Sequence, residues 1–123
     1  MQISNSEQDV LDVLWTESPL TVGQIVERCQ SKRDWHENTI KTLLARLLKK
    51  RVVKRSRDGG RFFYAPALSR EAVVTSAAEG LLDRFFDGQM QQFVAHFADQ
   101  RKLTKKDIRE MEAILAKVKP NAR

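Results

Sequence analysis

The chain has 123 residues, of which 41% are hydrophobic and 31% are charged, and its formal net charge is +6. This balance excludes the low-hydrophobicity composition of disordered chains, and no run of about 18 apolar residues is present to cross a membrane. The length allows one ordinary domain or two very small ones. The single cysteine, Cys29, cannot form an intrachain disulfide. We therefore expect a reducing, cytoplasmic location.

Positive charge is concentrated in residues 41–61. This stretch holds nine Lys and Arg residues and one acid, Asp58, and so carries +8, whereas the other 102 residues hold 13 basic and 15 acidic residues and carry −2. A basic segment of this kind is typical of proteins that bind polyanions. The alternative interpretation is a solvated charged face without a ligand.

The N-terminal third predicts two short helices. Ser6, with Asp9 three residues further on, indicates an approximate capping box for the first helix, which then places apolar residues on one face until a Ser-Pro pair ends it. Thr21 with Gln24 is a second capping signal, and it precedes the apolar stripe of the second helix. Cys29 lies in that stripe, so we expect a core thiol and not a reactive one.

A third helix is predicted to begin near residues 37–39. Ile40 and four leucines recur at helical spacing and are expected to be buried. The opposite face is polar at its start and basic further along, and it consists of Asn38, Thr39, Lys41, Thr42, Ala45, Arg46 and Lys49. His36 and Glu37, just before this helix, are interpreted as a capping environment.

After this helix, the residue pattern changes from one typical of helices to one typical of strands. Residues 52–57 and 61–65 are rich in β-branched and aromatic side chains and flank Asp58-Gly59-Gly60, which predicts a β-hairpin with a three-residue turn. Alternate members of the three aromatic residues at 62–64 are expected to pack under the hairpin; stacking on single-stranded bases is the other possibility. Pro66 is expected to stop the second strand.

The order of these elements is that of a winged helix-turn-helix, which we predict for residues 1–68. An α-helix fits the major groove of DNA, where base pairs show distinct donor and acceptor patterns. Thr39, Thr42 and Arg46 are the predicted base contacts, because the threonines are short and the arginine has a fork suited to guanine or phosphate. The predicted phosphate contacts, which position a protein without reading sequence, are Asn38, Lys41, Lys49, Arg57 and Arg61. Arg57 and Arg61 would both lie at the tip of the hairpin.

Residues 69–123 predict further helices, so the expected fold class is mainly α with one small hairpin. The apolar stripes of these helices have no large partner of their own, which predicts a homodimer whose second copy completes a helical bundle. The candidate dimerisation residues are Leu81, Leu82, Phe85, Phe93, Phe97, Ile108, Met111 and Leu115. A compact monomer is the alternative. Thr104 with Asp107 indicates the start of the last helix.

Taken together, these residues resemble the BlaI/MecI family of penicillinase repressors. The resemblance rests on Trp35 followed by Thr-Ile-Lys-Thr-Leu-Leu-Ala-Arg-Leu at 39–47, on Val13-Leu14-Trp15, and on Gly60-Arg61 with Phe63-Tyr64-Ala65-Pro66. It implies a cytoplasmic homodimeric repressor that reads an inverted repeat, typically with TACA/TGTA half-sites. β-Lactam resistance genes are one candidate set of regulated genes.

The resemblance also implies a means of relieving repression. Family members are typically cut in the dimerisation domain by a membrane sensor metalloprotease. The family's scissile bond is usually Asn-Phe, and the matching pair here is His96-Phe97. A copper-responsive branch carries a cysteine-rich metal motif near its C-terminus, and residues 69–123 contain no cysteine.

Other classes of function have less support in the sequence. The chain shows no catalytic motif, and its two histidines lack metalloprotease spacing, so we expect neither an enzyme nor a cofactor or metal site. A winged-helix module that binds proteins, a regulator that responds to a different signal, and an RNA-binding domain are the alternatives. Specific binding to duplex DNA would distinguish a DNA-binding repressor from the first of these. RNA binding would be expected to use aromatic platforms on a sheet, which only the short hairpin offers.

Overall fold

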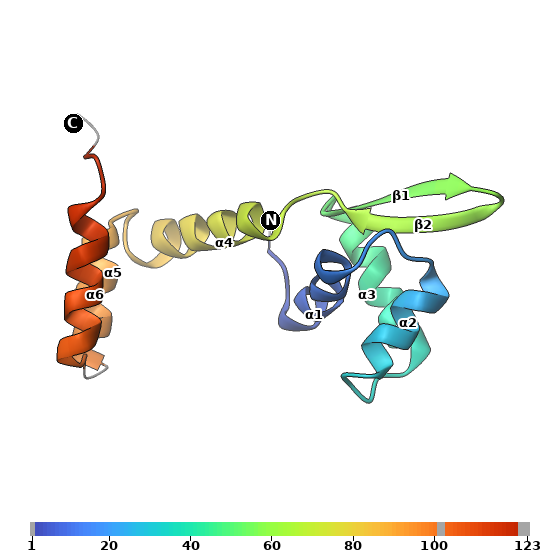
Figure 1. Cartoon of the computed structure of the whole chain (residues 1–123), viewed down its shortest axis with the longest axis horizontal. Coiled ribbons are helices and arrows are strands. Elements are labelled where there is room, and N and C mark those ends of the chain that lie inside the picture. Colours follow the sequence, from blue (N-terminus) through green and yellow to red (C-terminus); the bar gives the residue numbers. More distant parts are fainter. Residues whose placement is uncertain (1, 101–102, 121–123) are drawn as a thin grey trace. The chain divides into compact units, whose positions relative to one another are not determined.

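The computed structural model describes residues 2–100 and 103–120, and the chain divides into two compact units, Met1–Ala78 and Glu79–Arg123. The elements in chain order are α1 (Asn5–Thr16), α2 (Val22–Gln30), α3 (Glu37–Lys49), β1 (Val53–Asp58), β2 (Arg61–Pro66), α4 (Arg70–Phe85), α5 (Met90–Gln100) and α6 (Lys105–Ala116) (Figure 1). The predicted fold class, mainly α with one hairpin, is confirmed. In the described part of the chain, no helix is long and apolar enough to cross a membrane. The predicted domain boundary after residue 68 stays a prediction, and α4 runs across the division between the two units.

Helix α1 begins earlier than its sequence suggested. The N-cap is Ser4: the Glu7 N–H donates to Ser4 Oγ at 3.1 Å, and the Ser4 N–H donates to Glu7 Oε1 at 2.8 Å. The predicted pair of Ser6 and Asp9 is therefore wrong. Asp9 instead forms an ion pair with Arg33 at 2.9 Å. The pair of Ser4 and Glu7 starts the helix because it satisfies two backbone donors reciprocally.

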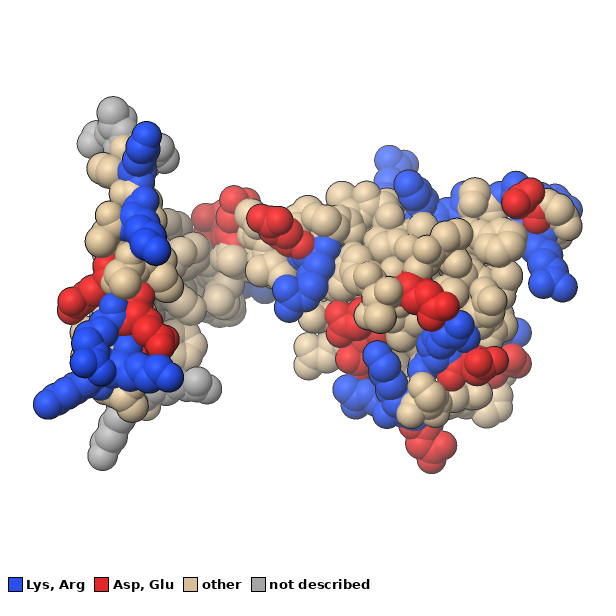
Figure 2. Space-filling model, in the orientation of Figure 1, with Lys and Arg blue, Asp and Glu red and all other residues tan. Residues whose placement is uncertain are grey.

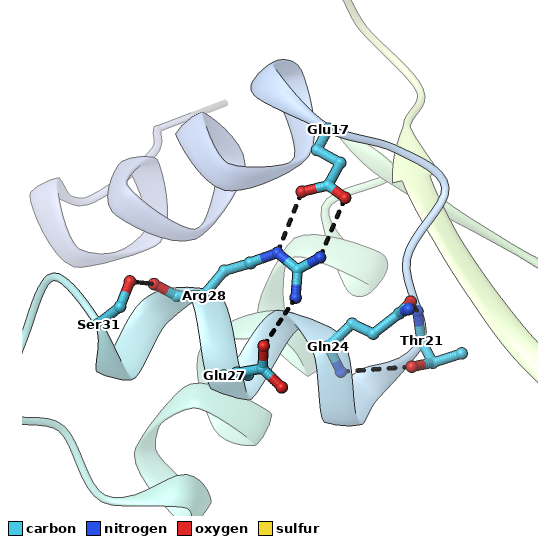
Figure 3. Close-up of polar contacts among 6 residues, drawn as sticks. All are labelled: Glu17, Thr21, Gln24, Glu27, Arg28 and Ser31. Carbon is cyan, nitrogen blue, oxygen red and sulfur yellow. Dashed lines mark hydrogen bonds and ion pairs between the residues drawn. The ribbon is translucent and has the colours of Figure 1, made fainter.

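The capping box predicted for α2 is confirmed, and the far end of the same helix is tied to α1 (Figure 3). Thr21 Oγ1 accepts from the Gln24 N–H at 3.3 Å, and Gln24 Oε1 accepts from the Thr21 N–H at 2.9 Å. The Arg28 guanidinium donates to both carboxylate oxygens of Glu17, at 3.0 Å each, and to Glu27 at 3.2 Å. Glu17 is the C-cap of α1, so this fork fixes the connection between the two helices. The hydrogen bonds from Arg28 lower the pKa of Glu17.

The core of Met1–Ala78 is shared by three helices and the hairpin. Trp15 packs at its edge, and its indole N–H donates to the Leu68 carbonyl at 3.0 Å, which ties α1 to the segment after the hairpin. Cys29 is buried in this core, as predicted, and burial raises the pKa of its thiol. The buried apolar residues are Val10, Leu11, Val13, Leu14, Leu20, Ile25, Val26, Cys29, Ile40, Leu43, Leu44, Leu47, Val52, Val53 and Tyr64.

The hairpin is confirmed, but its turn has two residues and not three. Asp58 pairs with Arg61, so only Gly59 and Gly60 lie between the strands. Their φ angles of +58° and +80° are those that a type I′ turn demands, and glycine adopts them without steric cost. The base of the hairpin is pinned to the α1–α2 connection by two hydrogen bonds between Leu20 and Tyr64, at 2.7 and 3.0 Å.

The unit Glu79–Arg123 contains the end of α4 with α5 and α6. The predicted start of α6 is confirmed, because Thr104 and Asp107 form a capping box with hydrogen bonds of 2.9 and 3.0 Å. Phe86, which directly follows α4, packs on α5: the Phe86 and Phe93 ring centres lie 5.5 Å apart in an edge-to-face arrangement. Among the described residues of this unit, no side chain is fully buried.

Candidate nucleic-acid interface

Helix α3 is amphipathic, and its two faces are those that the sequence predicted. Its start is capped by His36, whose Nδ1 accepts from the Asn38 N–H at 3.1 Å, so the predicted capping role is confirmed. The buried face consists of Ile40, Leu43, Leu44 and Leu47. These side chains anchor α3 in the core and leave its other face in solvent.

The exposed face of α3 holds every predicted contact residue of that helix. Thr39, Thr42 and Arg46 lie along it at helical spacing and are all exposed, and so are Asn38, Lys41 and Lys49. Two of these side chains have local partners: the Thr42 hydroxyl donates to the Asn38 carbonyl at 2.9 Å, and Lys41 Nζ lies 3.6 Å from Glu37. The Thr42 hydroxyl keeps its acceptor lone pairs, and the exposed Lys41 pair is weak in water.

Lys50 belongs to the basic stretch but does not belong to this face. Its Nζ donates to Glu7 Oε1 at 2.6 Å and to the Gln2 carbonyl at 2.7 Å. Glu7 is only 2% exposed. Burial alone would raise the pKa of Glu7, but hydrogen bonds from Lys50 and Ser4 outweigh that effect and the net pKa is lowered. The sequence carries no local signal of this pair, because its partners are 43 positions apart.

The hairpin separates the two arginines that the sequence placed together at its tip. Directly paired residues of antiparallel strands point to the same face. Arg57 pairs with Phe62, whereas Arg61 pairs with Asp58, so Arg57 and Arg61 lie on opposite faces. On the side of the molecule seen in Figure 2, basic side chains surround the hairpin, with acidic atoms at its outer end, while basic and acidic side chains mix over the helices of the same unit.

Four candidate cations are not used by internal ion pairs. In residues 2–100 and 103–120, no carboxylate lies within 4.0 Å of the charged groups of Arg46, Lys49, Arg57 or Arg61. Their positive charge is therefore available to an external anion. The same described residues include no group of three or more His, Cys, Asp or Glu side chains that could hold a metal ion.

The candidate dimerisation residues all lie in the unit Glu79–Arg123. Leu81, Leu82 and Phe85 are on α4, Phe93 and Phe97 on α5, and Ile108, Met111 and Leu115 on α6. Several are strongly exposed; Phe85 and Leu115 are 65% and 68% exposed. The predicted cleavage pair, His96 and Phe97, lies inside α5, where the Phe97 ring packs 4.9 Å from that of Phe93.

Three helices and a hairpin, with a polar and basic face on the third helix, define a winged helix-turn-helix. The family model described as penicillinase repressor matches residues 3–117. The chain therefore belongs to the penicillinase repressor family, as its resemblance to BlaI/MecI proteins indicated. This is a family of transcriptional repressors and not of enzymes, which confirms the corresponding prediction.

Individual relatives are similar over most of the chain. The penicillinase repressor of Staphylococcus aureus is 30% identical over 115 residues, which cover 94% of this chain and 91% of the relative. The methicillin resistance regulatory protein MecI of Mammaliicoccus sciuri is 28% identical and covers 94% of both chains. The solution structure of monomeric Bacillus licheniformis BlaI in complex with the blaP half-operator superposes with a TM-score of 0.53 and 30% identity, over 58% of this chain and 87% of the chain in that structure.

Proposed function

We propose that this chain is a sequence-specific DNA-binding repressor that acts as a homodimer on an inverted-repeat operator. The observation that carries the proposal is the solvent-exposed face of α3, where two threonines lie in one row with two cations that have no carboxylate partner among the described residues. Such a face suits the major groove, because short polar side chains admit close approach to base edges. Binding of the relative BlaI to a half-operator supports the same use of this fold. Repression would be steric, by occupation of a promoter, and would take place in the cytoplasm.

Base reading is assigned to Thr39, Thr42 and Arg46, and Arg46 offers the sharpest test. Arg46→Ala is expected to weaken operator binding by about 1–3 kcal/mol and to relax the preference at one base pair. Lys49→Ala serves as the matched variant, since a phosphate contact weakens binding to all sequences alike. An equal loss for Arg46→Ala on operator and random duplexes would show that it contacts phosphate.

The operator sequence can be selected directly from random DNA. Repeated selection of bound duplexes should return a palindrome with half-sites about one helical turn, or ~34 Å, apart. If the dimer makes about 6–8 phosphate contacts, its affinity should fall roughly 10³- to 10⁴-fold between 50 and 200 mM salt. Absence of binding to any duplex would refute the proposed function.

Dimerisation is assigned to the unit Glu79–Arg123. The support is a set of exposed apolar side chains on three short helices, in a unit whose described residues include none that is fully buried. A second copy would remove these surfaces from water. Leu115→Glu should shift the chain from dimer to monomer in sedimentation equilibrium, whereas Glu112→Gln, an exposed change on the same helix, should not. A wild-type chain that sediments as a monomer would contradict the assignment.

Relief of repression is assigned to a cut between His96 and Phe97 by a membrane sensor metalloprotease. The cut would remove α6 and the end of α5 from the dimerisation unit, and a protomer held at one half-site alone has half the contacts. Because this bond lies inside α5, the helix must unwind locally before a protease can act. Incubation with the cognate protease should yield a fragment ending at residue 96, and an intact chain would exclude this route.

A further inference from the structure

One face of the hairpin carries an exposed aromatic ring between two arginines. Phe62 is 41% exposed, and the guanidinium carbons of Arg55 and Arg57 lie 4.3 and 5.3 Å from the centre of its ring. Both distances are within the range of a cation–π interaction. Neither Phe62 nor Arg55 is used in the interface described above.

The strand register explains how these three side chains meet. Arg57 is directly opposite Phe62, and Arg55 is opposite Tyr64, so Arg55 reaches the ring along the diagonal of the ladder. Tyr64 and Val53 are on the same face and are buried, which fixes the base of the hairpin against the core. Beyond them the hairpin extends past the helices of its unit (Figure 1), and its outer part carries the arginines in solvent.

Among the residues that the structure describes, the two guanidiniums have no competing anion. In the described part of the chain, neither Arg55 nor Arg57 has a carboxylate within 4.0 Å, and Asp58 points to the opposite face. A ring holds a guanidinium by its flat face and leaves its edge N–H groups free to donate. Two positively charged groups are thus held near one another although they repel.

We propose that Arg55, Phe62 and Arg57 form a preassembled clamp for DNA backbone phosphates, in which Phe62 is the positioning residue. The proposal rests on the proposed function. Free arginine side chains lose rotamer freedom when they bind an anion, and a ring that already orders them removes part of that cost. Phosphate oxygens are the acceptors that guanidinium forks match. Phe62 itself need not touch DNA.

The test compares variants of the full chain by fluorescence anisotropy. The probes are two duplexes of about 30 base pairs, roughly three helical turns, one with two TACA/TGTA half-sites and one scrambled. Phe62→Leu should weaken binding to both about 3- to 10-fold and leave the salt slope near the wild-type value. Arg55→Gln and Arg57→Gln should each lower the magnitude of that slope by about 0.9 per protomer. Phe62→Tyr keeps the ring and should bind like the wild type.

The decisive measurement repeats Phe62→Leu in a chain that already carries Arg55→Gln and Arg57→Gln. If Phe62 acts only by positioning the two arginines, its substitution should not weaken DNA binding further in that chain. A loss of affinity as large as in the single variant therefore overturns the clamp. Unchanged binding by the single variant Phe62→Leu also overturns it, and so does a loss confined to one of the two duplexes. In the free chain, the side-chain protons of Arg55 should show a ring-current shift that Phe62→Leu removes. A wild type that binds neither duplex refutes the proposed function, whereas a wild type that binds while Phe62→Leu is neutral refutes only the clamp.

Discussion

Replacing Lys50 by methionine tests the ion pair between partly exposed Lys50, at the end of α3, and buried Glu7, in the first turn of α1. The substitution keeps the aliphatic stem and removes the ammonium group, which donates to Glu7 at 2.6 Å. Breaking a fully buried pair by removing one partner costs about 3–5 kcal/mol, because the other charge stays buried. The Lys50 side chain is 34% exposed, so water can partly replace it, and Glu7 keeps its bond from the Ser4 N–H. We therefore expect Lys50→Met to lower the free energy of unfolding by about 2–3 kcal/mol.

Urea denaturation followed by tryptophan fluorescence measures this loss. Both tryptophans of the chain, Trp15 and Trp35, lie in Met1–Ala78, so the signal reports the unfolding of that unit. With an m value of roughly 1–2 kcal/mol per M, the urea midpoint should fall by about 1–3 M at constant m. Lys49→Met is the matched control, since Lys49 is exposed and should shift stability by no more than about 0.5 kcal/mol. Equal small shifts for both lysines would refute the reasoning.

The stability difference between the wild type and Lys50→Met should depend on pH in a definite direction. The pKa of Glu7 is lowered in the folded chain, so the stability that its ionised form contributes is present above the unfolded value of about 4.3 and is lost as the pH falls through the folded value. Without Lys50, only the bonds from Ser4 oppose the effect of burial, so Glu7 takes up a proton at a higher pH than in the wild type. The gap between wild type and Lys50→Met should thus be largest near pH 7 and should narrow as the pH is lowered towards 4. A gap that widens on acidification would contradict this account.

Two further stability predictions can be checked with the same urea denaturation experiment. Leu47→Ala should lower the free energy of unfolding by about 2–5 kcal/mol, because Leu47 is fully buried. Leu48→Ala should lower it by less, because Leu48 is only half-buried, and the reverse order would contradict the packing. Gly60→Ala should lower the free energy of unfolding by about 1–2 kcal/mol, because the φ of Gly60 is +80°, even though there is open space for a methyl group. Gly23→Ala in α2 is the control and should be neutral or stabilising. Equal effects of the two substitutions would refute this reasoning.

The features that the sequence predicted correctly depend on residues that are close together along the chain. The faces of α3 follow from the spacing of its leucines, and the starts of α2 and α6 follow from Thr-x-x-Gln and Thr-x-x-Asp. Each depends on contacts between residues at most four positions apart. The sequence does not decide the start of α1, because Ser4 and Ser6 are each followed three residues later by an acid; in the structure the reciprocal hydrogen bonds between Ser4 and Glu7 distinguish them.

The features that were missed depend on register or on long-range contact. A three-residue turn would have placed Arg57 opposite Arg61, but the two-glycine turn places Arg57 opposite Phe62 instead. A slip of one residue in a strand exchanges its two faces, so this single difference separates the predicted arginines and creates the cluster around Phe62. Both turns contain Gly59 and Gly60 and differ only in whether Asp58 belongs to the turn or to the strand, so the composition of the segment does not decide between them.

The pair between Glu7 and Lys50 also changes what the basic stretch can do. Sequence counting assigns +8 to residues 41–61, but the charge of Lys50 is directed inward to a carboxylate. Neighbouring lysines should therefore act on different properties of the molecule. Lys50→Met should lower stability and leave the salt slope of DNA binding unchanged, whereas Lys49→Met should leave stability unchanged and lower the magnitude of that slope by about 0.9 per protomer. If both variants lowered the slope equally, Lys50 would reach DNA phosphates in the complex, and its pairing with Glu7 could not persist there.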